Sequence, residues 1–211
     1  MGNHQDYYSH SRPELVAALP ASDDNRVLDL GCGSGGMSRH IREQGRASEI
    51  WGVEINSDAA AVARQSGALD RVLEGDLETV TGQLPPSHFT HVIAGDVLEH
   101  LVDPWQALSL LKVSMAPGGH FICSIPNIRN LSFILALLFK GRFEYRDSGV
   151  MDRTHLRFFA RKDVYDLFDQ AGFRDILIGP VRPKKKLSWR IGKALLGDLV
   201  IKGFLVTARL P

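Results

Sequence analysis

Short apolar runs and stretches with helical periodicity alternate along the first part of this chain. The apolar runs predict buried strands at residues 27–30, 49–55, 71–76, 91–97 and 120–126. The periodic stretches predict helices at residues 13–19, 37–44, 56–66 and 103–115. Strands that alternate with helices at this spacing are typical of a doubly wound α/β sheet with a parallel core.

After residue 126 the alternation becomes irregular. An apolar helix is expected at 131–139, a charged irregular stretch at 140–157, a helix at 161–171, and strands at 174–180 and 203–209. A regular core followed by such an excursion predicts a cap that shapes a substrate pocket. We therefore expect one domain, 1–211, whose parts are an N-terminal lid and helix (1–23), a core (24–126), a cap with the sixth strand (127–202) and a final strand (203–211).

Composition narrows the class of protein. The 211 residues suit one domain, and the net charge of +1 gives no electrostatic reason to expect nucleic acid as a partner. Two cysteines exclude a disulfide framework and fit a reducing compartment. The polar start lacks a signal-peptide pattern, and the longest apolar run, 131–139, is too short to span a bilayer. We therefore expect a cytoplasmic protein.

The most informative stretch is the turn that follows the first predicted strand. Residues 31–36 read Gly-Cys-Gly-Ser-Gly-Gly, and a helical stretch begins at once. In such a turn, backbone N–H groups and a helix N-terminus face a nucleotide-like ligand. Glycines at 31 and 33 permit positive φ and let a ligand approach the main chain. The spacing also matches the dinucleotide fingerprint, with Glu54 near its acidic position, so a nicotinamide-dependent oxidoreductase is one interpretation.

Asp29 argues against that interpretation. It lies inside the first apolar strand, two residues before Gly31, where its carboxylate would repel a pyrophosphate. A cationic ligand would be attracted to the same carboxylate. The turn therefore favours a cofactor that carries positive charge.

Further motifs occur in the order of the predicted strands. Glu54 follows the second strand, Glu-Gly-Asp-Leu (74–77) the third, Gly-Asp (95–96) ends the fourth, and Met-Ala-Pro-Gly-Gly (115–119) precedes the fifth. Together with residues 27–35 they resemble the motifs of class I S-adenosylmethionine-dependent methyltransferases, over about residues 24–126. The resemblance implies S-adenosyl-L-methionine as methyl donor. It also implies a Rossmann-like, mostly parallel sheet of seven strands in the order 3-2-1-4-5-7-6, with the last strand antiparallel and a C-terminal cap insertion.

The resemblance also implies which residues contact the cofactor. Glu54 would bind the ribose hydroxyls, and Asp76 would reach the adenine amino group. The full implied set is Asp29, Gly31, Cys32, Gly33, Glu54, Ile55, Asp76, Leu77, Gly95 and Asp96. A carboxylate that binds two vicinal hydroxyls is a bidentate acceptor, and its loss is costly once it is buried. Taken singly, Asp76 could be a turn residue and Glu54 could simply end a strand.

Residues 96–104, Asp-Val-Leu-Glu-His-Leu-Val-Asp-Pro, form a second motif. If the chain turns helical after Asp96, Glu99 and His100 lie on one face of the turn. The pattern is similar to one in small-molecule O-methyltransferases of the ubiquinone-biosynthesis type, which implies that it can hold a divalent cation near the substrate oxygen. The structural alternative is that both side chains brace the loop above the cofactor. Two carboxylates and one imidazole do not close a metal site, so we favour the brace and predict no metal ligand.

Residues 152–159, Asp-Arg-Thr-His-Leu-Arg-Phe-Phe, form a third motif. They resemble a stretch found in a bacterial subgroup associated with polysaccharide and sugar modification. A hydroxyl acceptor needs a proton acceptor, and an imidazole titrates near neutral pH. We therefore predict His155 or His100 as general base, with a bracing role for His155 and Arg157 as the alternative.

The resulting prediction is O-methylation of a small molecule or a sugar hydroxyl, polysaccharide precursors included. N-methylation of a small molecule, nicotinamide-dependent oxidation and a non-catalytic partner subunit remain as alternatives. The basic segment 182–193 and the apolar helix 131–139 could contact an anionic membrane or a lipid-linked acceptor, although a solvated cap is the more common explanation for such charges. Tyr7 and Tyr8 could close over the cofactor. Neither the acceptor nor the oligomeric state follows from the sequence.

Overall fold

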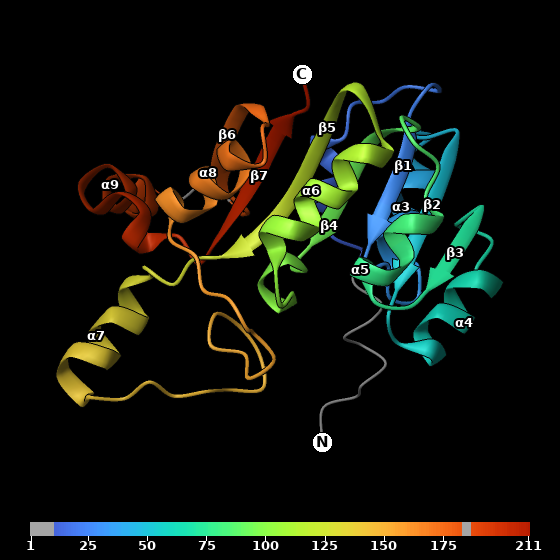
Figure 1. Ribbon diagram of the computed structural model, residues 1–211. Coiled ribbons are helices and arrows are strands. Elements are labelled where there is room, and N and C mark those ends of the chain that lie inside the picture. The colour runs from blue at the N-terminus through green and yellow to red at the C-terminus, as the bar shows by residue number, and fades with distance from the viewer. Residues whose placement is uncertain (1–10, 183–186) are drawn as a thin grey trace.

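A computed structural model describes residues 11–182 and 187–211 of the chain (Figure 1). Tyr7 and Tyr8, which are predicted to form a lid, lie outside the described residues, as do the lysines at 184–186 in the basic segment.

A seven-stranded sheet forms the middle layer, in the order β3-β2-β1-β4-β5-β7-β6. Its strands are β1 (Arg26–Leu30), β2 (Glu49–Glu54), β3 (Arg71–Glu74), β4 (Phe89–Gly95), β5 (Met115–Pro126), β6 (Arg174–Pro180) and β7 (Gly203–Arg209). Strands β1 to β5 pair in parallel, and β7 runs antiparallel to both of its neighbours, β5 and β6. The predicted fold class and strand order are confirmed.

Helices cover both faces of this sheet. The helices of the sheet layers are α2 (Pro13–Ala18), α3 (Gly36–Glu43), α4 (Ser57–Gln65), α5 (Leu77–Val80), α6 (Pro104–Ser114) and α8 (Arg161–Gln170). Helices α2 and α3 bury Leu15 and Ile41 in one hydrophobic cluster, whereas α5, α6 and α8 pack into a larger cluster that includes Phe121 and Phe168. Burial of apolar side chains on both faces explains why the strands are almost continuously apolar.

The ends of several elements differ from the sequence prediction. Strand β4 begins at Phe89 and ends at Gly95, two residues before each predicted boundary. Strand β5 begins at Met115, because Ser87 and His88 donate backbone N–H bonds to the carbonyls of residues 113 and 114 and so start the pairing early. The short helix α5, the 3₁₀ turns η1 (Thr81–Gln83) and η3 (Gly197–Val200), and helix α9 (Leu187–Leu196) were not predicted.

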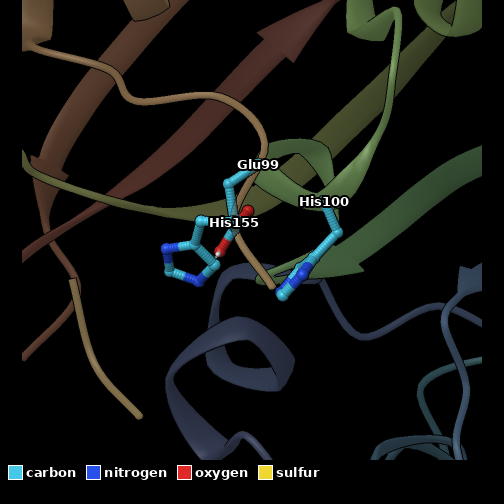
Figure 2. A group of neighbouring side chains, drawn as sticks. All are labelled: Glu99, His100 and His155. Atoms are coloured by element: carbon cyan, nitrogen blue, oxygen red, sulfur yellow. Dashed lines mark ion pairs between the residues drawn. The ribbon is translucent and has the colours of Figure 1, made fainter. Parts of the chain in front are cut away.

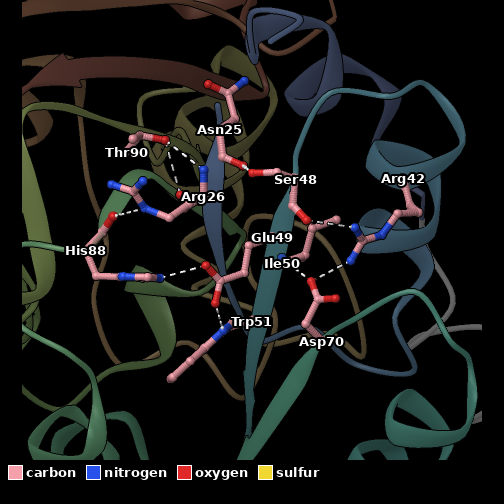
Figure 3. Close-up of polar contacts among 10 residues, drawn as sticks. All are labelled: Asn25, Arg26, Arg42, Ser48, Glu49, Ile50, Trp51, Asp70, His88 and Thr90. Carbon is pink, nitrogen blue, oxygen red and sulfur yellow. Dashed lines mark hydrogen bonds and ion pairs between the residues drawn. The ribbon is translucent and has the colours of Figure 1, made fainter. Parts of the chain in front are cut away.

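The two edges of the parallel sheet carry different kinds of side chains. At the amino edge, Glu49 accepts hydrogen bonds from His88 Nε2 at 2.8 Å and from Trp51 Nε1 at 2.5 Å, and Arg42 pairs with Asp70 at 2.6 Å (Figure 3). These groups satisfy one another and brace the strand starts. Ligands of parallel α/β sheets bind at the opposite, carboxyl edge, where the loops diverge.

Residues 127–202 contain elements of the main layers as well as projecting ones. Helix α8 and strand β6 belong to the sheet layers, whereas α7 (Leu131–Lys140), the stretch 141–160 and α9 lie beyond β5 and β7 (Figure 1). Buried Asn127 ties this part together, because its Nδ2 donates to the carbonyls of Asp198 and Ile201 at 2.8 and 2.9 Å. No helix within the described ranges is long and apolar enough to cross a membrane.

Candidate active site

The turn between β1 and α3 has the backbone conformation that only glycine adopts readily. Gly31, Gly33 and Gly35 have φ values of 63°, 54° and 83°, as the glycine pattern predicts. A Cβ at position 31 would lie 2.9 Å from Val97 Cγ2, so the chain there passes close to the loop after β4. The turn thus places backbone atoms at the carboxyl edge of the sheet, and its glycines have no side chains that would block a ligand from this backbone.

Asp29 lies beneath this turn and is fully buried. Its Oδ2 accepts a hydrogen bond from Ser38 Oγ at 2.6 Å, whereas Oδ1 has no hydrogen-bond partner within the described residues. Burial raises the pKa of the carboxyl to about 7; the Ser38 hydroxyl opposes this rise and the charge of Glu54 adds to it. An unpaired buried carboxylate oxygen is unfavourable by itself and suits a site that receives a positive group.

Glu54 ends β2 beside the turn and is 5% exposed. Its Oε2 accepts from the backbone N–H of Gly33 at 2.8 Å, and its Oε1 accepts from that of Asn56, also at 2.8 Å. Each oxygen keeps a second lone pair, so the carboxylate can accept further hydrogen bonds. The next residue, Ile55, is 67% exposed at the same edge.

Cys32 has a packing position in this turn. It is buried, its backbone N–H donates to the Val53 carbonyl at 3.1 Å, and its Sγ would lie 2.6 Å from a Cβ placed on Gly52. Burial raises the pKa of the thiol, and the charges of Asp29 and Glu54 raise it further. A thiol held protonated in this way is a poor nucleophile, so any contact that Cys32 makes with a ligand comes through its backbone or its apolar surface.

The ends of β3 and β4 complete the edge. Asp76 is exposed and begins a turn in which its carbonyl accepts from the N–H groups of Thr79 and Val80, and Leu77 after it is buried at the start of α5. Gly95 ends β4, where a Cβ would lie 3.1 Å from Leu15 Cδ1 in α2. The predicted cofactor residues therefore line one continuous edge, although they come from four separate strands.

Asp96 follows Gly95 with a φ of 55°, which is uncommon for a residue other than glycine. Its Oδ1 accepts from Ser124 Oγ at 2.6 Å, and its Oδ2 pairs with the Arg12 guanidinium at 2.6 Å. Sequence patterns did not point to Arg12 or Ser124, because neither belongs to a motif and each is distant along the chain. The pair fixes the carboxylate at the end of β4.

Glu99, His100 and His155 form the second part of the site (Figure 2). The first two lie in the 3₁₀ turn η2 (Leu98–His100), and His155 comes from the loop after α7. Backbone N–H groups of Leu156 and Arg157 donate to the Glu99 carbonyl at 2.9 and 3.0 Å and so dock this loop on the turn. One potential ligand atom from each of the three side chains lies within 4.8 Å of the others.

The hydrogen bonds of the two histidines fix the role of each ring nitrogen. Nδ1 of His100 lies 3.2 Å from the Thr154 carbonyl, and Nδ1 of His155 lies 3.1 Å from the Val150 carbonyl. A carbonyl only accepts, so in the neutral form of each ring Nδ1 carries the proton and Nε2 the lone pair. Burial, together with the charge of His155, lowers the pKa of His100. Both imidazoles are thus set up to accept a proton or to bind a cation.

Glu99 is the most deeply buried member of this group. It is 1% exposed, and neither carboxylate oxygen has a hydrogen-bond partner in the described part of the chain. Oε1 lies 4.0 Å from His155 Nε2. Burial raises the pKa of Glu99 well above its usual value, and the charge of Asp96 raises it further. His155, which lies outside the motif at 96–104, thus adds a second imidazole beside Glu99 and His100.

Comparison with known families agrees with this geometry. A family model described as a methyltransferase domain matches residues 3–178. The chain belongs to this family. Its seven-stranded sheet has the strand order that the sequence motifs predict, and S-adenosylmethionine-dependent methyltransferases of known structure share this fold.

Two relatives illustrate the range of similar methyltransferases. Ubiquinone biosynthesis O-methyltransferase of Cereibacter sphaeroides (strain KD131) is 30% identical over 166 residues, which are 75% of this chain and 64% of that protein. Malonyl-[acyl-carrier protein] O-methyltransferase of Enterobacter lignolyticus is 31% identical over 116 residues, which are 55% of this chain and 45% of that protein. The chain thus spans between 45% and 64% of the length of these curated relatives.

Solved structures share the fold at lower identity. A S-adenosylmethionine-dependent methyltransferase from Mesorhizobium loti has a TM-score of 0.67 and 21% identity, with 97% of this chain and 99% of that chain covered. Phosphoethanolamine N-methyltransferase 2 of Haemonchus contortus, in complex with S-adenosyl-L-methionine, has a TM-score of 0.67 and 16% identity, over 95% of this chain and 52% of that chain. The solved structures with this fold thus include an N-methyltransferase, whereas the two sequence relatives are O-methyltransferases.

Proposed function

We propose that this chain transfers the methyl group of S-adenosylmethionine to a hydroxyl of a small molecule or sugar, polysaccharide precursors included. The observation that carries the choice of a hydroxyl is the pair His100 and His155, whose Nε2 lone pairs lie at the carboxyl edge next to the turn after β4. Their rings are 4.8 Å apart. Both relatives described above are O-methyltransferases, which supports the same choice.

The residues of the glycine turn fit this methyl donor. S-adenosylmethionine carries a sulfonium and an ammonium group, and the unpartnered Oδ1 of Asp29 would be a counter-charge for one of them. Glu54 would accept from the ribose hydroxyls with its remaining lone pairs, and Asp76 would reach the adenine amino group. The methionine portion would lie along the backbone of Gly31, Cys32 and Gly33.

The remaining edge residues would enclose the adenosine. Ile55 and Leu77 flank it with apolar side chains, whereas Gly95 and Asp96 bound it at the end of β4. Because Arg12 and Ser124 hold the Asp96 carboxylate, it is fixed before any ligand arrives, and preorganised contacts are not weakened by a loss of side-chain freedom on binding.

Catalysis in this proposal relies mostly on alignment. When bound, S-adenosylmethionine supplies an already activated methyl group. The chain holds acceptor and donor in line in a site from which water is excluded, which can supply a large part of the rate enhancement. Nε2 of His100 or of His155 takes the hydroxyl proton as the acceptor oxygen becomes bonded to the methyl carbon, and the bond between that carbon and sulfur breaks.

A divalent cation at Glu99, His100 and His155 is a second candidate for handling this proton. Two imidazole nitrogens and a carboxylate form a donor set that suits zinc, manganese or iron, and the unpartnered Glu99 oxygens fit such a ligand role. When bound, the cation would acidify a hydroxyl that coordinates it. The motif at 96–104 alone did not favour metal, because two carboxylates and one imidazole do not close a site, whereas the loop after α7 adds the imidazole of His155.

The test is transfer of labelled methyl from S-adenosylmethionine to a panel of phenols, sugars and nucleotide sugars. Of the variants His100→Ala and His155→Ala, the one that removes the base should lose at least about 100-fold in turnover with cofactor affinity kept, whereas His88→Ala at the amino edge should not. Full turnover in both site variants would show that the base assignment is wrong.

Dialysis against EDTA, followed by Mn²⁺ or Zn²⁺, separates the two candidates. Activity that EDTA abolishes and a cation restores supports the cation, and activity that EDTA leaves unchanged supports a histidine base. Methylated amines in place of alcohols among the products would point to the N-methyltransferase alternative. Binding of the cofactor without product on any acceptor would point to a non-catalytic role.

A further inference from the structure

Helix α7 is apolar on nearly every side, yet none of its residues is buried. Only Ser132 and Lys140 among its ten residues are polar. Leu138 and Phe139 are 70% and 76% exposed, and the helix projects from the sheet layers (Figure 1). Packing against the described part of the chain therefore does not explain its composition, and contiguous exposed apolar surface of this kind usually marks an interaction site.

The apolar surface continues past the end of the helix. Phe143 is 46% exposed and its ring contacts Phe133 in α7 at 5.5 Å and Tyr145 at 5.5 Å between centroids. We define the α7 surface by its exposed apolar members, Leu135, Leu137, Leu138, Phe139, Phe143 and Tyr145. Aliphatic and aromatic side chains mixed in this way are typical of segments that enter the boundary between headgroups and acyl chains.

Positive charges border this surface. Lys140 and Arg142 are exposed and have no acidic partner among the described residues, and Arg146 pairs with Glu144 only at 3.6 Å. Two copies of the chain that met through their α7 surfaces would bring these cations together. An anionic lipid headgroup layer would instead be attracted to each of them, by about 1 kcal/mol per basic residue near the surface in general.

We propose that the α7 surface binds anionic phospholipid membranes, with α7 lying in the plane of the interface. The proposal goes beyond methyl transfer and does not require it. Helix α7 has ten residues, so it inserts at the interface and does not span the bilayer.

A line of aromatic rings joins the α7 surface to the candidate active site. Phe143 contacts Phe158 at 5.8 Å between centroids, and Phe158 contacts His155 at 6.3 Å. An acceptor with an apolar tail in the membrane could therefore follow these rings toward His155. This extension rests on the proposed function, whereas the membrane contact itself does not.

Co-sedimentation with vesicles tests the membrane contact. The full chain should bind vesicles of phosphatidylcholine mixed with phosphatidylglycerol, and bind pure phosphatidylcholine vesicles at least about fivefold more weakly. Leu138→Asp with Phe139→Asp should reduce partitioning by about tenfold or more, because both side chains leave the apolar phase. Val62→Asp with Val113→Asp, at exposed positions of α4 and α6, is the matched control and should bind like the wild type.

Charge-reversal variants test the electrostatic part of the proposal. Lys140→Glu with Arg142→Glu should abolish the preference for phosphatidylglycerol, whereas Arg39→Glu with Arg64→Glu, which changes the net charge equally on α3 and α4, should retain most of it. Circular dichroism spectra that match the wild type show that each variant is folded.

Two results would overturn the proposal. One is partitioning that is the same for the α7 variants and their controls. The other is a dimer in light scattering that Leu138→Asp with Phe139→Asp dissociates, without vesicle binding by the wild type, since the α7 surface would then be a self-association surface. Neither result bears on methyl transfer to a water-soluble acceptor, so the proposed function is tested separately.

Discussion

Replacing Asp29 by Asn should stabilise the protein and weaken cofactor binding at the same time. The wild-type carboxylate is fully buried, and within residues 11–182 and 187–211 only its Oδ2 is hydrogen-bonded, to Ser38. A buried carboxylate with one unpaired oxygen destabilises the folded state and favours the binding of a cationic ligand. An amide of the same shape retains the Ser38 hydrogen bond and removes the charge.

The magnitude follows from the pKa of Asp29. Its ordinary value is 3.8, and burial raises it to about 7 in the folded chain. Between these pH values the folded state binds a proton that the unfolded state has lost, so the free energy of unfolding falls as pH rises. The fall is about 1.4 kcal/mol per pH unit, or about 2–3 kcal/mol between pH 5 and pH 7, and it does not continue above pH 7.

Urea denaturation of both proteins from pH 5 to pH 8 measures this effect. The free energy of unfolding of Asp29→Asn, relative to the wild type, should increase by about 2–3 kcal/mol over that range, because other titrating groups cancel in the comparison. In calorimetry, the affinity of the wild type for S-adenosylmethionine should be about fivefold to tenfold lower at pH 6 than at pH 7.5, since the carboxyl must first lose its proton. The variant should bind more weakly and without this pH dependence.

A difference between the two proteins that stays constant with pH would refute the reasoning. It would mean that Asp29 titrates in the folded chain as it does in the unfolded chain. Equal cofactor affinity in both proteins would refute the second half, the role of Asp29 as a counter-charge. Asp58→Asn, at a position in the first turn of α4, is the control for loss of one negative charge.

Three further predictions concern other parts of the fold. Burial, with the charge of His120, lowers the pKa of His91 from 6.5 to about 4, so the unfolded state binds an extra proton as pH falls below 6.5. The stability of the wild type relative to His91→Phe should therefore drop by about 2–3 kcal/mol from pH 6.5 to pH 4.5 in urea titrations, because the other titrating groups cancel in this difference. Gly31→Ala should lose about 2–3 kcal/mol of stability, because its Cβ would press on Val97. The control Gly45→Ala, at a φ of 58° with open space around it, should lose only about 1 kcal/mol. Similar losses for both variants in thermal unfolding would contradict the close approach of Gly31 to Val97. Asn127→Ala should lower the free energy of unfolding by about 2–4 kcal/mol, and amide hydrogen exchange should become faster at residues 198–201. Unchanged exchange there would show that the hydrogen bonds of the Asn127 side chain do not hold residues 198–201 in place.

The sequence predicts the core of this fold well because each signal is local. Apolar runs mark the parallel strands, and glycines at 31 and 33 mark positive φ, which the backbone adopts. Strand order is a different matter, because periodicity does not specify which strands are neighbours. The order 3-2-1-4-5-7-6 was available only through the resemblance of the motifs to a family.

The site was less accessible from the sequence because its contacts join residues that are far apart in the chain. Arg12 meets Asp96, and Glu99 meets His155, through the packing of α2 and of the loop after α7 on the end of β4. Helix α5 was missed because four residues are too few to show a helical period. The start of β5 was missed because Pro117, Gly118 and Gly119 read as a turn, whereas pairing with the β4 side begins before them.

The central claim is that the carboxyl edge around Asp29 and Glu54 binds S-adenosylmethionine. Equilibrium dialysis with the labelled cofactor against wild type, Glu54→Ala and Glu49→Ala tests it most directly, since both glutamates lie on β2 at opposite edges of the sheet. One molecule should bind per chain, Glu54→Ala should lose at least about tenfold in affinity, and Glu49→Ala should bind like the wild type. Retention of NAD in place of S-adenosylmethionine, or equal binding by Glu54→Ala and wild type, would contradict the claim.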